Sequence, residues 1–130
     1  MTMTVRTPIG GANIWYFPDG YLPEKTPGKM EAHEAIMILN VHDQAANIKL
    51  DIYFENREAI RDIPITVGAE RVISLHLDVP ADIGGIRIPP LTQYAVRLRS
   101  ELPIVAMFGR LDTTQSNMAY YTVSSFSESY

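Results

Sequence analysis

The chain has 130 residues, of which 46% are hydrophobic and 20% are charged, and its net charge is −4. This composition excludes a disordered chain, and the length is that of one ordinary domain. The 11 Lys and Arg residues are scattered among 15 acidic ones, which disfavours nucleic acid as a partner, and the absence of cysteine excludes disulfides, thiolate nucleophiles and Cys-ligated zinc.

Alternating apolar and polar residues are the dominant pattern along the chain. Residues 47–54 alternate strictly, with Ile48, Leu50 and Ile52 on one face of a strand and polar residues on the other. Residues 35–39 are continuously apolar, which is typical of a strand buried on both faces. The predicted strands are residues 12–17, 35–39, 47–54, 63–67, 71–77, 94–98, 104–111 and 117–123.

The segments between these strands carry turn-forming residues. Pro18-Asp19-Gly20 predicts a turn after the first strand, and residues 18–30 and 79–90 read as long irregular loops rich in Pro and Gly. Pro and Gly interrupt nearly every stretch long enough for a helix. We therefore predict an all-β, single-domain antiparallel β-sandwich of about eight strands with little or no helix. The domain spans residues 1–130, with its core at about 12–123 and with frayed termini, including residues 124–130.

The sequence shows no recognisable catalytic or metal-binding motif. His33, His42 and His76 do not have the spacing of metal ligands, and there is no nucleophile elbow and no phosphate-binding glycine loop. No stretch approaches the roughly 20 apolar residues that span a bilayer, and the first eleven residues lack a secretory signal. We expect no metal, no cofactor, no membrane insertion, no enzymatic activity and a cytoplasmic location.

Polar and aromatic residues are concentrated where predicted strands meet loops. The single tryptophan, Trp15, precedes the Pro18 turn, His33-Glu34 precede the most apolar strand, and Arg110 and Asp112 follow another apolar strand. Arg110 and Asp112 share a strand face and could pair with each other. A ligand site and a purely structural role, with a core tryptophan and a salt bridge, are both open for these residues.

An ordered set of short motifs resembles the sensory rhodopsin transducer family, from about residue 12 to residue 123. Two positions differ from the usual pattern: Met107 stands where Gln is common, and Asp19 stands where Glu is more frequent. The matching residues are Trp15, Asp19-Gly20-Tyr21, Pro23, His33-Glu34, Ile38-Leu39-Asn40, Ile52-Tyr53, Arg71, Pro103-Ile104-Val105, Arg110-Leu111-Asp112 and Asn117.

The resemblance implies a β-sandwich that assembles as a homotetramer. It also implies a soluble cytoplasmic protein that partners a membrane photoreceptor or binds small polar metabolites such as sugars. An apolar strand at residues 35–39 independently favours a closed homo-oligomer, because its outer face needs a cover.

The leading hypothesis is a non-enzymatic module that binds a small, sugar-like metabolite and takes part in signalling. A ligand-free protein-interaction adaptor and a cupin-like or isomerase-like sugar enzyme are the alternatives. The candidate ligand-binding residues are Trp15, His33, Glu34, Arg71, Arg110 and Asp112.

Overall fold

The computed structural model describes residues 9–24, 33–112, 119–122 and 125–130, except for the side chains of residues 112 and 119–121. These residues form antiparallel strands and one short 3-10 turn, η1 (Pro80–Ile83). The strands are β1 (Ala12–Tyr21), β2 (His33–Asn40), β3 (Ala46–Phe54), β4 (Ile60–Val67), β5 (Arg71–His76), β6 (Gln93–Asp112), β7 (Ala119–Thr122) and β8 (Phe126–Glu128).

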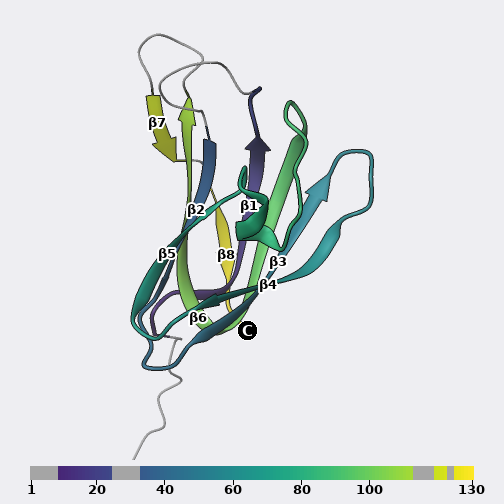
Figure 1. The fold of residues 1–130 in the computed structure, drawn as a ribbon. Coiled ribbons are helices and arrows are strands. Elements are labelled where there is room, and N and C mark those ends of the chain that lie inside the picture. Colours follow the sequence, from purple (N-terminus) through teal and green to yellow (C-terminus); the bar gives the residue numbers. More distant parts are fainter. Residues whose placement is uncertain (1–8, 25–32, 113–118, 123–124) are drawn as a thin grey trace, which may run out of the picture.

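The strands form an all-β sandwich of two layers that share one long strand (Figure 1). The first half of β6 lies between β3 and β1, in a layer ordered β4-β3-β6-β1-β8 that we call sheet A. Its second half lies between β2 and β7, in a layer ordered β5-β2-β6-β7 that we call sheet B. The turn η1 contacts both β5 and β4, so it joins the edges of the two layers.

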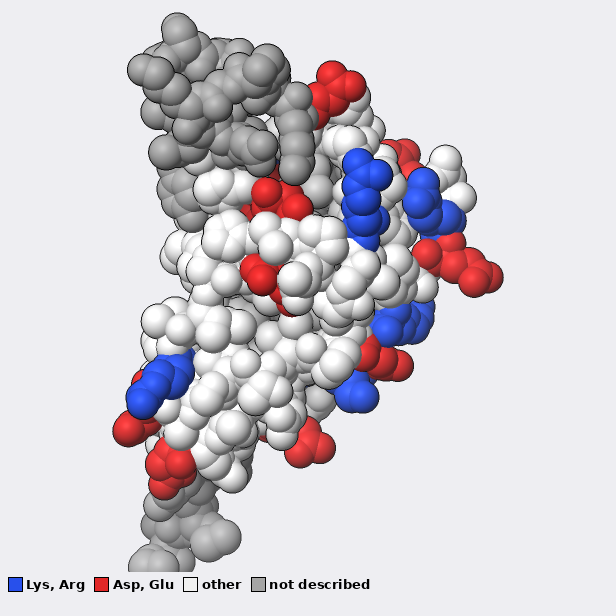
Figure 2. Space-filling view, viewed as in Figure 1, with Lys and Arg blue, Asp and Glu red and all other residues white. Residues whose placement is uncertain are grey.

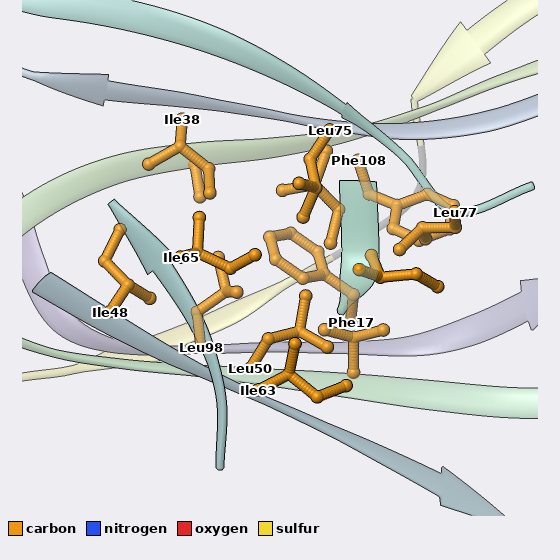
Figure 3. Close-up of a cluster of buried hydrophobic side chains, with 14 of the residues drawn as sticks. Phe17, Ile38, Ile48, Leu50, Ile63, Ile65, Leu75, Leu77, Leu98 and Phe108 are labelled. Atoms are coloured by element: carbon orange, nitrogen blue, oxygen red, sulfur yellow. The ribbon is translucent and has the colours of Figure 1, made fainter. Parts of the chain in front are cut away.

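The core lies between the layers and is built by strand alternation. On β3, Ile48, Leu50 and Ile52 are buried, as the period-two pattern predicts. In Figure 3, Phe17 lies in the middle of this cluster, and its ring centroid is 5.7 Å from that of Phe108 on sheet B. Burial of apolar side chains from both layers is the main stabilising contribution to the fold.

Two predicted boundaries near prolines were wrong. Residues 94–98 and 104–111 belong to one continuous strand, β6. Pro103 lies between the segment of β6 that pairs with β3 and the segment that pairs with β2, so its missing N–H interrupts neither ladder. Pro18-Asp19-Gly20 form no turn but continue β1 through a register shift between Phe17 and Gly20. Gly20 is required there, since an added Cβ would lie 2.5 Å from ring carbons of Tyr94.

The C-terminal tail and the apolar β2 also differ from the sequence-based expectation. Residues 126–128, expected to fray, form β8 beside β1, and the Tyr16 hydroxyl donates a 2.7 Å hydrogen bond to Glu128. On β2, Ile36 and Ile38 face the core, whereas Leu39 on the opposite face is 38% exposed. The strand is therefore not buried on both faces along its whole length. Residues 117, 118 and 123 of the last predicted long strand lie outside the described residues.

Candidate functional site

A fully buried carboxylate, that of Glu34 on β2, is the centre of the candidate site. Its Oε1 accepts hydrogen bonds from the backbone N–H of Tyr21 at 2.8 Å and from the hydroxyl of Tyr94 at 2.6 Å. Its Oε2 accepts a charge-assisted hydrogen bond from Nε of Arg110, which also forms the ion pair. A buried carboxylate needs such partners, since an unpaired charge inside a protein is very costly.

Strand register explains how Arg110 reaches Glu34. The two residues are direct cross-strand neighbours in the β2–β6 ladder, so their side chains lie on the same face of sheet B. Nη2 of Arg110 extends further and donates a 2.9 Å hydrogen bond to the backbone carbonyl of Asp19 on β1. Arg110 thus connects β6, β2 and the end of β1.

Tyr94, at the start of β6, is the third member of this cluster. Its side chain is only 1% exposed, and its ring packs against Gly20. Burial raises the pKa of Tyr94 far above its usual value, and the negative charges of Glu34 and, more weakly, Asp78 raise the pKa further. The hydroxyl therefore remains a hydrogen-bond donor to Glu34 at any ordinary pH.

A cavity of about 290 Å³ lies next to this cluster. Its walls come from three chain segments, residues 22–23, 77–80 and 87–90. The Leu91 N–H donates a 2.7 Å hydrogen bond to the Leu22 carbonyl, and the Leu77 N–H donates a 3.0 Å hydrogen bond to the Glu34 carbonyl. The second bond ties the cavity wall directly to the backbone of Glu34. The lining residues are Leu22, Pro23, Leu77, Asp78, Pro80, Arg87, Ile88 and Pro90.

Polar groups in the lining have unmet bonding capacity. The Oδ1 atom of Asp78 is buried yet accepts no hydrogen bond within the described part of the chain. Buried polar atoms in native proteins nearly always have a partner, and within the described residues this oxygen and Oγ of Ser100 lack one. Figure 2 shows acidic side chains within a largely uncharged surface near η1, while most Lys and Arg residues lie toward one side of that face.

A second fully buried carboxylate, Asp51, lies on β3 away from this cavity. It accepts 2.8 Å hydrogen bonds from Arg97 and Arg99 and a 3.0 Å bond from the Asp62 N–H. Burial alone would raise the pKa of Asp51, but the bonds from Arg99, the Asp62 N–H and Arg97 outweigh it and lower the pKa to about 2. Neither Asp51 nor its partners line the cavity.

The structure brings Glu34 and Arg110 together but places other candidate residues elsewhere. The indole of Trp15 donates to the backbone carbonyls of Ile104 at 2.9 Å and Ala12 at 3.2 Å, beside the core ring of Phe17. Arg71 is exposed at the start of β5 and donates to the carbonyls of two adjacent residues. Trp15 and Arg71 therefore have local structural contacts and do not touch the Glu34 cluster.

His33 lies beside Glu34 in sequence, and its half-buried ring meets the ring of His76 edge to face, with centroids 5.1 Å apart. His76 in turn is 3.7 Å from a carboxylate oxygen of Asp82. No group of three or more His, Asp or Glu residues in the described ranges is arranged to hold a metal ion. The side chain of Asp112 lies outside the described residues, so its predicted pairing with Arg110 is not visible.

Sequence reasoning missed Tyr94, Asp78 and Arg87. Tyr94 looked like an ordinary strand residue, and only its position opposite Gly20 in the β1–β6 ladder brings its hydroxyl to Glu34. Asp78 and Arg87 lie in and around the Pro- and Gly-rich segment 79–90, whose length was the one available signal.

No helix in the described part of the chain is long and apolar enough to span a bilayer.

Comparison with known proteins identifies the family. The family model described as Anabaena sensory rhodopsin transducer matches residues 10–127. A crystal structure of Thermotoga maritima 1070 superimposes with a TM-score of 0.80 at 28% identity, covering 92% of this chain and 97% of that one. The Anabaena sensory rhodopsin transducer structure superimposes with a TM-score of 0.70 at 30% identity, covering 85% and 96% of the two chains. No curated protein matches the chain. The chain belongs to the Anabaena sensory rhodopsin transducer family.

Proposed function

We propose that this protein is a cytoplasmic, non-enzymatic module that binds a small polar metabolite and transmits the bound state to a protein partner. The observation that carries the proposal is the cavity beside the Glu34 cluster, which Asp78 and Arg87 line together with apolar residues. Binding pockets typically combine apolar walls with a few fixed polar groups, and this cavity has that composition. Glu34 and Arg110 hold the surrounding segments in place, while the contributions of Trp15, His33, Arg71 and Asp112 stay predictions.

Calorimetry tests the binding step. The protein is titrated with a panel of neutral sugars, sugar acids and amino acids, and we expect one compound class to bind with one site per chain. Asp43→Asn, at an exposed loop position outside the cavity lining, is the control variant and should bind equally well. Absence of binding across the whole panel would contradict the proposal and favour the adaptor.

We propose that the outer face of sheet B is a protein-contact surface. Leu39, Val72 and Val105 form one cross-strand row, and Met37 and Met107 lie in the next row; we call these five residues the outer patch. Four of them are 38% to 63% exposed, which is unusual for a contiguous apolar group on a monomer. This patch also favours the alternative of a protein-interaction adaptor.

We further propose that the outer patch is covered by subunit contacts in a homotetramer. Light scattering at micromolar concentration should give four times the chain mass, and Met107→Glu should lower it because a charge would be buried in the contact. Lys49→Glu, an exposed charge change on sheet A, is the matched control and should leave the mass unchanged. A monomeric wild-type protein would contradict this assembly.

The proposed signalling partner is a membrane photoreceptor, since the similar Anabaena protein is named a sensory rhodopsin transducer. Co-expression with a microbial sensory rhodopsin followed by purification in detergent should recover both proteins together. Recovery of this protein without the rhodopsin would rule out that class of partner and leave ligand binding untouched.

A further inference from the structure

Two charged side chains of opposite sign line the cavity without pairing with each other. The Oδ1 atom of Asp78 is buried and accepts no hydrogen bond from the described residues. Arg87 is exposed at the cavity, and no ion pair or hydrogen bond of its side chain occurs within the described ranges. The other lining residues are apolar or proline, so the cavity itself supplies no partner for either charge.

This arrangement specifies complementary groups on a ligand. A carboxylate in a cavity wall accepts hydrogen bonds, and a hydroxyl or ammonium group of a ligand is the matching donor for Asp78. An exposed guanidinium offers a planar fork of donors that matches a carboxylate. A volume of about 290 Å³ is small among ligand pockets and suits a molecule of monosaccharide or amino-acid size.

We propose that the cavity binds a small acid that also carries a hydrogen-bond donor. The donor group is directed to the Asp78 carboxylate, and the ligand carboxylate is directed to Arg87 at the exposed side. This assignment rests on the proposed binding function and narrows its ligand class. A polyhydroxy acid with a hydroxyl donor and an amino acid with an ammonium donor share this chemistry, and the experiment separates them.

A neutral molecule of the same shape satisfies only half of this site. Neutral glucose would satisfy Asp78 but leave Arg87 with water as its only partner. A simple carboxylate such as acetate would face Arg87 but leave Asp78 unsatisfied. The combination of both groups in one ligand is therefore the distinguishing feature.

Calorimetry with paired compounds tests the ligand class directly. Glucuronate is compared with glucose, and alanine is compared with alaninamide. In each counterpart an uncharged group replaces the carboxylate and the donor is retained, and we call it the neutral counterpart for that reason. At least one acid should bind about tenfold or more tightly than its counterpart, because a charge-assisted hydrogen bond is lost in the neutral compound. The pair that shows the difference identifies the donor as hydroxyl or ammonium.

Two variants assign the roles of the residues. Arg87→Gln should weaken binding of the acid about tenfold and leave binding of the neutral counterpart unchanged, whereas Lys49→Gln, an exposed charge removal on sheet A, should change neither. Asp78→Asn should weaken binding of both members of the pair. The same variant should melt no lower than wild type, since it removes a negative charge that no ion pair within the described residues compensates. A structural role of Asp78 would instead lower the melting temperature.

The outcomes separate this inference from the proposed function. If neutral and acidic compounds bind equally and Arg87→Gln has no effect, the inference is overturned while ligand binding stands. Binding of a compound without a carboxylate, when neither acid binds, overturns the inference alone. If no compound of any class binds, both fall. A melting temperature lowered by several degrees in Asp78→Asn, with binding unchanged, also overturns it.

Discussion

Two buried carboxylates in this protein, Asp51 and Glu34, are both fully shielded from water but are held in different ways. The partners of Asp51 are two guanidiniums from β6 and a backbone N–H from β4, all within sheet A. The partners of Glu34 come from the end of β1 and from both ends of β6. Asp51 therefore reinforces one layer, whereas Glu34 fastens separate segments around a cavity.

The difference indicates distinct roles for two groups of the same chemistry. An ion network confined to one sheet stabilises pairing that the backbone ladder already provides. A carboxylate that joins chain segments far apart in the sequence fixes positions that the ladder alone does not. Perturbing Glu34 should alter the cavity, and perturbing Asp51 should alter stability without altering the cavity.

The largest expected effect follows from removing the guanidinium that pairs with Glu34. Arg110→Leu leaves a buried carboxylate without its counter-charge, so we expect the free energy of unfolding to fall by about 3–5 kcal/mol. Urea denaturation measures this change. Adding Glu34→Gln to the same chain should recover part of the loss, because a neutral amide needs no counter-charge. A loss below about 1 kcal/mol would show that the pair is not important for the fold.

An intermediate effect is expected from Asp51 in acid. Its folded pKa of about 2 lies below the unfolded value, so its stabilising contribution is present above about pH 4 and is lost as the pH falls through 2. The loss should be about 2 kcal/mol, measured as the difference in acid-induced destabilisation between wild type and Asp51→Asn. Equal pH dependence of the two proteins would contradict this assignment.

The smallest effect is expected at Tyr94. Tyr94→Phe removes one hydrogen bond to Glu34 but keeps the buried ring, so the free energy of unfolding should fall by about 1.5 kcal/mol. Denaturant titration provides the value. Tyr53→Phe, at a partly buried ring on sheet A, is the matched control and should cost less. An equal loss in the two variants would deny any special role to the Tyr94 hydroxyl.

The sequence allowed the fold class to be predicted but only part of the site. Alternation on β3 and the apolar β2 identified strands correctly, because local patterns report which face is buried. The extent of β6 was missed because the effect of Pro103 depends on which strands lie beside it. A local turn signal at Pro18 was likewise overridden by pairing with β6.

The same limit applies to the site residues. Glu34 and Arg110 could be selected from the sequence because charged residues beside apolar strands are unusual. Their pairing, and the role of Tyr94, depend on cross-strand register between residues at least 60 positions apart in the chain. Asp78 could not be recognised because its defining property, a buried oxygen without a donor, exists only in the folded chain.

Amide hydrogen exchange in Tyr94→Phe and Asp51→Asn tests most directly whether Glu34, and not Asp51, holds the cavity walls. The reporters are the N–H groups of Leu77 and Leu91, which bond to the carbonyls of Glu34 and Leu22, with core amides of β2 as the reference. We predict that Tyr94→Phe speeds exchange at Leu77 and Leu91 relative to the reference amides. Asp51→Asn should change reporters and reference alike. Selective acceleration at Leu77 and Leu91 in Asp51→Asn, or its absence in Tyr94→Phe, would contradict the account.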